Sequence, residues 1–144
     1  MTPFHILLVE DSPVDAKLLK IAFQNEPELC VSLVVAENGA KALAYLHGDP
    51  PYSGAPAPDL VILDWNLPQF SGLDVLDAIR GDRRLRDLRA VMFSASPCEE
   101  TENQARKRGV SADGYFSKPF DYDEFMDVAR AILGRFTTHH HHAR

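Results

Sequence analysis

The chain has 144 residues, of which 45% are hydrophobic and 25% are charged, and these proportions are typical of one soluble globular domain. The formal net charge is −6, which argues against direct nucleic-acid binding because that role needs a basic face. No apolar run is long enough to span a bilayer, and the N-terminus lacks the features of a signal peptide. We therefore expect a cytoplasmic protein without a membrane segment.

Short apolar runs alternate along the chain with stretches of helical periodicity. Residues 60–63 are wholly apolar, as expected for a strand that is buried on both faces of a sheet. Residues 49–58 contain four prolines and a glycine, and they are predicted to form a surface loop. The predicted strands are 4–9, 31–36, 60–63, 90–93 and 114–117.

A helix is predicted after each strand, and several of these helices begin with a capping signal. Ser12 with Asp15 fits a capping box, and Ser96-Pro97-Cys98-Glu99 repeats its Ser-Pro-x-acid opening. Five strand–helix units in strict alternation predict an α/β fold. In this fold a five-stranded parallel sheet carries helices on both faces, with right-handed crossovers.

We assign residues 1–136 to this single domain and residues 137–144 to a tail. The run His139–His142 is typical of a purification tag, and the alternative is a native tail that binds metal. No shift of composition divides the rest of the chain, so we predict no output domain.

Polar side chains follow four of the predicted strands. Glu10 and Asp11 follow the first strand, Asp64 the third, Ser94 the fourth and Lys118 the fifth. Ligands of an open parallel sheet bind at the carboxyl ends of its strands, so we expect these side chains to converge. Clustered carboxylates favour a hard cation such as Mg²⁺, and a carboxylate can act as a nucleophile toward a phosphoryl group.

Each of these residues also has a simpler interpretation when it is taken alone. Glu10 and Asp11 could favour a helix dipole, and Asp64 could be a turn residue. Ser94 could satisfy backbone groups, and Lys118 could be a solvated charge. Their joint placement at four strand ends favours the functional interpretation.

At these residues the chain resembles the receiver domain of two-component response regulators, a (βα)5 flavodoxin-like fold. The resemblance covers about residues 4 to 135. Order, spacing and strand placement all agree with the family. The matching segments are Val9-Glu10-Asp11-Ser12, Leu63-Asp64-Trp65-Asn66-Leu67-Pro68, Ser71-Gly72, Phe93-Ser94-Ala95 and Tyr115-Phe116-Ser117-Lys118-Pro119-Phe120.

The resemblance implies a role for each residue of the expected site. Asp64 would be the phosphoacceptor, and Lys118 would hold the phosphoryl group. Asp11 would bind Mg²⁺ directly and Glu10 through water, while Asn66 would offer its backbone carbonyl. Glu10 stands where the family more often has Asp, which puts its metal contact in doubt.

The resemblance also implies how the domain would switch. Ser94 and Tyr115 would form the pair that moves on phosphorylation, and the Lys118–Pro119 peptide would be cis. The domain would be a signalling module rather than an enzyme, with self-phosphorylation and autodephosphorylation chemistry.

The expected partner is a sensor histidine kinase. The segments 49–58, Leu46-His47-Gly48 and Asn66-Leu67-Pro68 resemble single-domain regulators that work with phytochrome-type kinases, which points to a bacteriophytochrome. A His-containing phosphotransfer protein is a candidate downstream partner. We also expect a homodimer through the last two helices and the fifth strand, with Phe120 and Phe136 as candidate apolar anchors if they are exposed.

Three alternative functions are each disfavoured by residues of the expected site. A flavodoxin-like ligand-binding module would need glycines or hydroxyls after the first strand to cradle phosphate, and Glu10-Asp11-Ser12-Pro13 stands there instead. A hydrolase of the aspartyl-phosphate type would need an acid two residues after Asp64, where Asn66 stands. A receiver-like scaffold that is never phosphorylated would not need the full set of acids.

Overall fold

The computed structural model describes residues 2–142, with side chains as far as residue 137. Its strands are β1 Phe4–Val9, β2 Val31–Ala36, β3 Leu60–Leu63, β4 Ala90–Ser94 and β5 Gly114–Ser117. Its helices are α1 Pro13–Gln24, α2 Gly39–His47, α3 Gly72–Gly81, α4 Cys98–Lys107 and α5 Tyr122–His142. The alternating strands and helices of the sequence prediction are therefore confirmed. No helix in the described part of the chain is long and apolar enough to cross a membrane.

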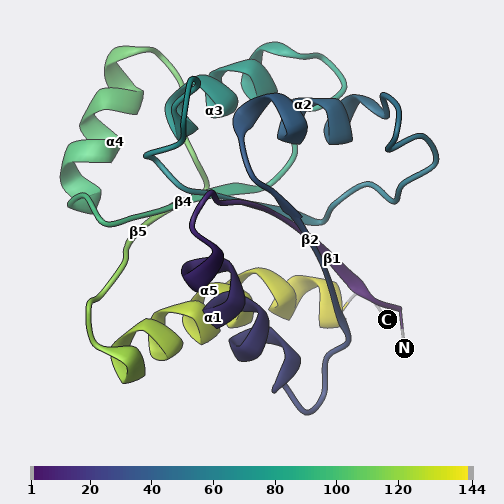
Figure 1. The fold of residues 1–144 in the computed structure, drawn as a ribbon, viewed down its shortest axis with the longest axis vertical. Helices are drawn as coiled ribbons and strands as arrows, with labels where there is room; N and C mark the ends of the chain where they lie inside the picture. The colour runs from purple at the N-terminus through teal and green to yellow at the C-terminus, as the bar shows by residue number, and fades with distance from the viewer. Residues whose placement is uncertain (1, 143–144) are drawn as a thin grey trace.

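The strands form one parallel sheet in the order β2-β1-β3-β4-β5. Helices α1 and α5 cover one face, and α2, α3 and α4 cover the other (Figure 1). The strand order reverses at β1, between its neighbours β2 and β3. A doubly wound sheet places a ligand crevice at such a reversal, outside the carboxyl ends of the strands.

Each face of the sheet has its own apolar core. On β1, Ile6 and Leu8 pack toward α1 and α5, whereas Leu7 and Val9 pack toward α2 and α3. This alternation follows from the two-residue repeat of a strand. It also explains why all four residues of β3 are buried: the central strand has a helix layer on each side.

The first turns of the helices confirm one capping prediction in part and correct another. Ser12 caps α1 by accepting a hydrogen bond from the Asp15 N–H at 3.3 Å. The prediction that Ser96 opens α4 is wrong, because Pro97 is the cap residue and has no capping side chain. The Cys98 N–H instead donates to Ser117 Oγ at 3.1 Å. A residue of β5 therefore supplies the polar partner at the start of α4.

The last helix continues past the boundary that we placed after Phe136. Helix α5 reaches His142, and Thr137 Oγ1 donates to the Leu133 carbonyl at 2.6 Å. The helix therefore does not end where the tail was predicted to begin. The origin of the histidine run stays a prediction, and residues 143–144 lie outside the described residues.

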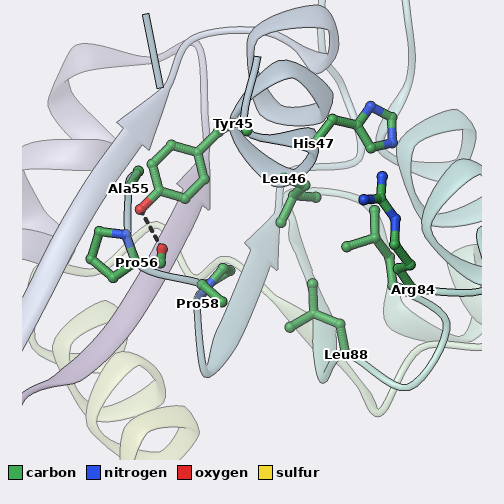
Figure 2. A pocket seen from close by; sticks show the side chains of 11 residues that line it. Tyr45, Leu46, His47, Ala55, Pro56, Pro58, Arg84 and Leu88 are labelled. Carbon is green, nitrogen blue, oxygen red and sulfur yellow. Dashed lines mark hydrogen bonds between the residues drawn. The ribbon is translucent and has the colours of Figure 1, made fainter. Parts of the chain in front are cut away.

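The proline-rich segment 49–58 is a loop, as predicted, and it packs against α2. The Tyr45 hydroxyl donates to the Pro56 carbonyl at 2.8 Å and holds the loop in place (Figure 2). Between the loop, α2 and the segment that contains Arg84 and Leu88 lies a pocket of about 320 Å³. None of the predicted site residues lines this pocket.

Candidate functional site

The sheet brings four of the predicted side chains to the ends of neighbouring strands. Backbone hydrogen bonds continue the parallel ladder by one residue beyond the strands. The Asp64 N–H donates to the Val9 carbonyl at 3.0 Å, and the Lys118 N–H donates to the Ser94 carbonyl at 2.6 Å. The backbone therefore fixes where Asp64 and Lys118 leave the sheet before any side-chain contact forms.

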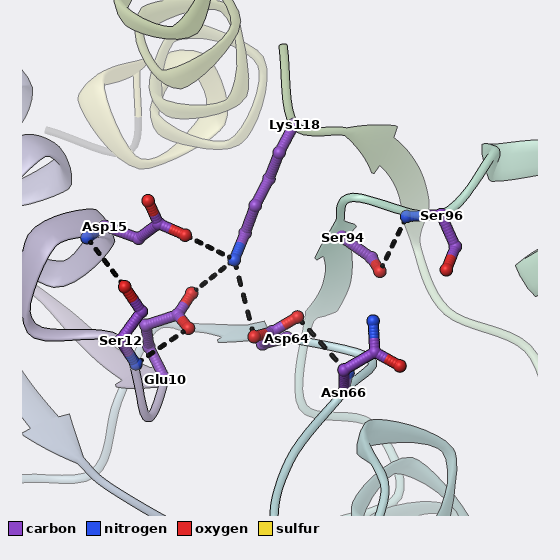
Figure 3. Close-up of polar contacts among 8 residues, drawn as sticks. All are labelled: Glu10, Ser12, Asp15, Asp64, Asn66, Ser94, Ser96 and Lys118. Carbon is purple, nitrogen blue, oxygen red and sulfur yellow. Dashed lines mark hydrogen bonds and ion pairs between the residues drawn. The ribbon is translucent and has the colours of Figure 1, made fainter. Parts of the chain in front are cut away.

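The Lys118 ammonium lies among three carboxylates (Figure 3). Its Nζ is 2.7 Å from Glu10 Oε1, 2.9 Å from Asp15 Oδ2 and 3.4 Å from Asp64 Oδ2. The side chains of Lys118, Glu10 and Asp64 are all less than a tenth exposed. The ammonium donates hydrogen bonds to Glu10 and Asp15, whereas its contact with Asp64 is a longer ion pair.

The cluster shifts the pKa of its buried members. Burial, together with a hydrogen bond shared with Asp64, raises the pKa of Glu10 to about 8, and the ammonium of Lys118 opposes this rise. Burial by itself would lower the pKa of Lys118. The hydrogen bonds to Glu10 and Asp15, together with the charges of Glu10 and Asp64, outweigh that effect and raise the pKa of Lys118 to about 12. Lys118 is therefore a permanent cation at the site.

Three of the acids could hold a metal ion together. Carboxylate oxygens of Glu10, Asp11 and Asp64 all lie within 4.8 Å of one another. Asp11 is exposed, so this cluster opens to solvent on one side and is buried on the other. Oxygen donors of this kind suit a hard divalent cation that keeps several of its waters. The residues present therefore fit such an ion.

Asn66 lies beside the Asp64 carboxylate, as Figure 3 shows. Its backbone N–H donates to Asp64 Oδ1 at 3.3 Å. The predicted use of its carbonyl as a metal ligand stays a prediction. The side chain of Asn66 is an amide, which cannot act as a general acid or base as the hydrolase alternative requires.

The two residues of the predicted switch pair, Ser94 and Tyr115, have separate hydrogen-bond partners in this structure. Ser94 is buried at the end of β4, and its Oγ accepts a hydrogen bond from the Ser96 N–H at 3.2 Å. The Tyr115 hydroxyl accepts from the Ala112 N–H at 2.9 Å, which ties it to the loop before β5. Ser94 therefore lies at the site, whereas the Tyr115 hydroxyl is held by its own loop.

The prediction of a cis Lys118–Pro119 peptide is wrong for this structure. The cis peptide within the described residues is Pro50–Pro51, and Lys118–Pro119 is trans. An X–Pro bond prefers trans by roughly 0.5–1 kcal/mol unless its surroundings hold the cis form.

The structure places at the site two residues to which the sequence analysis gave no role there. Asp15 was assigned to a capping box, yet its carboxylate pairs with Lys118. Gly72 begins α3 directly against the Asp64 backbone, and a β-carbon there would collide with the Asp64 carbonyl oxygen. The place of Asp15 in the first turn of the helix that follows the first strand was the signal that could have placed it at the same end of the sheet.

Comparison with known proteins agrees with this geometry. Residues 6–130 match the model of the response regulator receiver domain. The chain belongs to the receiver domain family of response regulators. It therefore shares its family with phosphoacceptor signalling domains rather than with conventional enzymes, and the cluster of Glu10, Asp11 and Asp64 fits the acidic site of these domains.

Two curated relatives are similar to most of this chain. The chain is 33% identical over 132 residues to the transcriptional regulatory protein KdpE of Mycobacterium tuberculosis, matching 92% of this chain and 52% of the relative. It thus spans about half the length of that protein. It is also 33% identical to the chemotaxis protein CheY of Pseudomonas aeruginosa, covering 90% of this chain and 96% of CheY.

Solved structures add a more specific likeness. The phosphorylated cyanobacterial phytochrome response regulator RcpA matches with a TM-score of 0.86 and 28% identity, over 94% of each chain. The Mn²⁺-bound form of Rcp1, a Synechocystis response regulator, matches with a TM-score of 0.83 and 26% identity, over 92% of this chain and 93% of Rcp1. The receiver domain is thus similar to regulators that carry a phosphoryl group or a divalent metal.

Proposed function

We propose that this receiver domain accepts a phosphoryl group on Asp64 from a sensor histidine kinase, in a reaction that depends on Mg²⁺. One observation carries the proposal. The Asp64 carboxylate, at the end of the central strand β3, has the Lys118 ammonium at 3.4 Å and carboxylate oxygens of Glu10 and Asp11 within 4.8 Å. A nucleophile, a permanent cation and a cation-binding cluster are what phosphoryl transfer to a carboxylate needs.

The reaction follows from the chemistry of these groups. An oxygen of Asp64 bonds to phosphorus, the phosphorus–nitrogen bond to the donor histidine breaks, and the imidazole nitrogen keeps the electron pair and takes a proton. Lys118 would pair with a phosphoryl oxygen, and the Ser94 hydroxyl would donate to another. Mg²⁺, held by Asp11, Asp64, the Asn66 carbonyl and, through water, Glu10, would neutralise charge on the transferring group.

The kinase in this proposal is of the phytochrome type. The support is the likeness to RcpA and to the bacteriophytochrome response regulator AtBRR, which matches with 32% identity and a TM-score of 0.73 over 93% of this chain and 94% of AtBRR. A His-containing phosphotransfer protein is the proposed onward acceptor. A cytoplasmic location follows from such partners.

Phosphorylation in this proposal changes a surface for self-association that is built from α4, β5 and α5. Ser94 would move toward the phosphoryl group and Tyr115 would follow it. Phe120, which is fully exposed between β5 and α5, supports this surface as an apolar anchor. Phe136 does not, because it is 6% exposed and belongs to the core.

A small-molecule phosphodonor with Mg²⁺ tests the central claim. We expect the intact protein to gain the mass of one phosphoryl group, held by an acid-labile bond. Asp64→Asn should gain none, while Asp87→Asn, which removes an exposed carboxylate between α3 and β4, should be labelled like the wild type. Labelling of Asp64→Asn at another carboxylate would overturn the assignment.

A further inference from the structure

Two helices of this domain begin with the same Ser-x-x-Asp sequence, but only one of them forms a complete capping box. In α3 the Asp74 N–H donates to Ser71 Oγ at 3.1 Å, and the Ser71 N–H donates back to Asp74 Oδ2 at 3.0 Å. This reciprocal pair satisfies two backbone donors at the helix start. The box in α3 therefore shows what the Asp15 carboxylate of α1 would do if nothing else engaged it.

In α1 the second half of the box is taken by a different residue. The Asp15 N–H donates to Ser12 Oγ, but the Ser12 N–H donates to Glu10 Oε2 at 3.2 Å. The Asp15 carboxylate is thereby released from its capping role. The Asp15 carboxylate instead accepts a hydrogen bond at 2.9 Å from Nζ of Lys118, the residue that follows β5 (Figure 3).

The contact places Asp15 in competition with the acceptor. The three carboxylate partners of Lys118 Nζ are unequal, and the Asp64 oxygen, at 3.4 Å, is the most distant. Glu10 and Asp15 thus draw the ammonium toward α1. A phosphoryl group on Asp64 can gain the full charge-assisted contact with Lys118 only if the ammonium gives up part of this pairing.

Asp15 differs from the other acids in its relation to a metal ion. The oxygens that lie together as a cation-binding cluster belong to Glu10, Asp11 and Asp64, and Asp15 is not among them. A divalent ion at that cluster would therefore offset the charges of the other acids more than that of Asp15. The charge of Asp15 stays directed at Lys118.

We propose that Asp15 is a positioning residue that competes with the phosphoryl group of Asp64 for Lys118 and so limits the stability of the phosphorylated state. This inference rests on the proposed function, in which Asp64 is the phosphoacceptor. It acts through an equilibrium between two sets of ion pairs and needs no additional chemical step. The side chain of Asp15 is 27% exposed, so the competition is partly screened by solvent.

Binding of beryllofluoride, a stable analogue of a phosphoryl group on a carboxylate, measures this competition. The analogue is titrated with Mg²⁺ at saturation, and Trp65, the only tryptophan and the residue after Asp64, reports binding by fluorescence. Asp15→Asn should bind beryllofluoride about fivefold more tightly than the wild type, which is the size that one partly exposed ion pair supports. Asp15→Glu, which keeps the carboxylate, should return toward wild-type affinity.

Two further variants separate this role from a general effect of charge. Asp87→Asn removes one exposed carboxylate elsewhere and should leave the affinity within about twofold of the wild type. In a Lys118→Gln background, adding Asp15→Asn should no longer tighten binding, because there is no ammonium to release. Thermal unfolding of every variant checks that the fold is retained.

The outcomes decide between the two proposals. Unchanged or weaker binding by Asp15→Asn, with normal binding by the wild type, overturns the role of Asp15 and leaves the phosphoacceptor assignment standing. A full-sized effect that persists without Lys118 also overturns it, because Asp15 would then act on the analogue directly. Failure of the wild type to bind beryllofluoride overturns the proposed function, and the role of Asp15 with it.

Discussion

Gly72 and Asp64 touch through their backbones, and the contact leaves no room for a side chain on residue 72. A β-carbon there would collide with the Asp64 carbonyl oxygen and lie 2.9 Å from the Met92 side chain. The Gly72 N–H also donates to the Trp65 carbonyl at 2.8 Å. The start of α3 therefore packs against the end of β3 through a residue that has to be glycine.

Gly72→Ala should disturb both the stability and the chemistry of the domain. Overpacking of this kind costs typically about 1–3 kcal/mol of unfolding free energy, and the shift should slow labelling of Asp64 by a phosphodonor. Gly81→Ala is the matched control, because Gly81 lies in the same helix with nothing within 4 Å of a β-carbon. It should be neutral or stabilising by about 0.5 kcal/mol. Denaturant unfolding that ranks the two variants equally would contradict the docking argument.

Asp11→Asn should weaken Mg²⁺ binding without weakening the fold. Asp11 is the exposed member of the acidic cluster, so its loss changes the charge of the site but little packing. We expect the Mg²⁺ dissociation constant, followed by Trp65 fluorescence, to rise on the order of tenfold. Asp87→Asn serves as the charge-matched control. A Mg²⁺ affinity that is equal in the two variants would exclude Asp11 from the metal site.

Arg108 connects the end of α4 to the start of α3. Its guanidinium donates to Asp74 at 2.8 Å and also pairs with Asp77. Hydrogen bonds from Arg108 and from the Ser71 backbone lower the pKa of Asp74 below its ordinary value of 3.8. Because the folded pKa is lowered, the stability from this contact is present above pH 3.8 and is lost as the pH falls through the folded value.

Arg108→Ala should therefore destabilise the domain modestly at pH 7, and the difference from the wild type should shrink below pH 3.8. The pairs are exposed, so we expect a small destabilisation that becomes smaller in high salt. Urea unfolding of both proteins at pH 7 and at a pH below 3.8, with and without added salt, measures this difference in stability. A destabilisation that is the same at both pH values would show that Arg108 acts through packing of its stem.

The order of strands and helices was predictable because local signals agree with the global fold. The wholly apolar β3 and the five strand–helix units indicate a parallel sheet before any contact is known. The same topology brings Glu10, Asp64, Ser94 and Lys118 to one end of the sheet. Their convergence follows from where the strands stop rather than from the details of packing.

Contacts that depend on a choice between two partners were not predictable. The Ser12 pattern indicates a capping box, but the pattern cannot show that Glu10 takes the Ser12 N–H and releases Asp15 to Lys118. Ser96 and Ser117 are both serines near the start of α4, and only the three-dimensional register of β4 with β5 places Ser117 at the Cys98 N–H. In both cases a tertiary contact overrides a local one.

Phe120 and Phe136 were both predicted from the sequence as candidate dimer anchors, but the structure places Phe120 on the surface and Phe136 in the core. Phe120 is fully exposed beside Tyr122, which is 55% exposed. Phe136 is 6% exposed in the core between the sheet and the α1–α5 layer. A solvated aromatic can contribute to association, whereas a buried one contributes to folding.

Replacing each phenylalanine by alanine should therefore affect a different property: the stability of the fold for Phe136 and self-association for Phe120. Phe136→Ala should lower the unfolding free energy by about 3 kcal/mol or more because it leaves a cavity. Phe120→Ala should change the unfolding free energy by less than about 0.5 kcal/mol, yet it should weaken the proposed dimer. Light scattering with and without Mg²⁺ and beryllofluoride measures association. A wild-type protein that stays monomeric in both states at high concentration would refute the dimer, and a dimer that Phe120→Ala leaves intact would place the interface elsewhere.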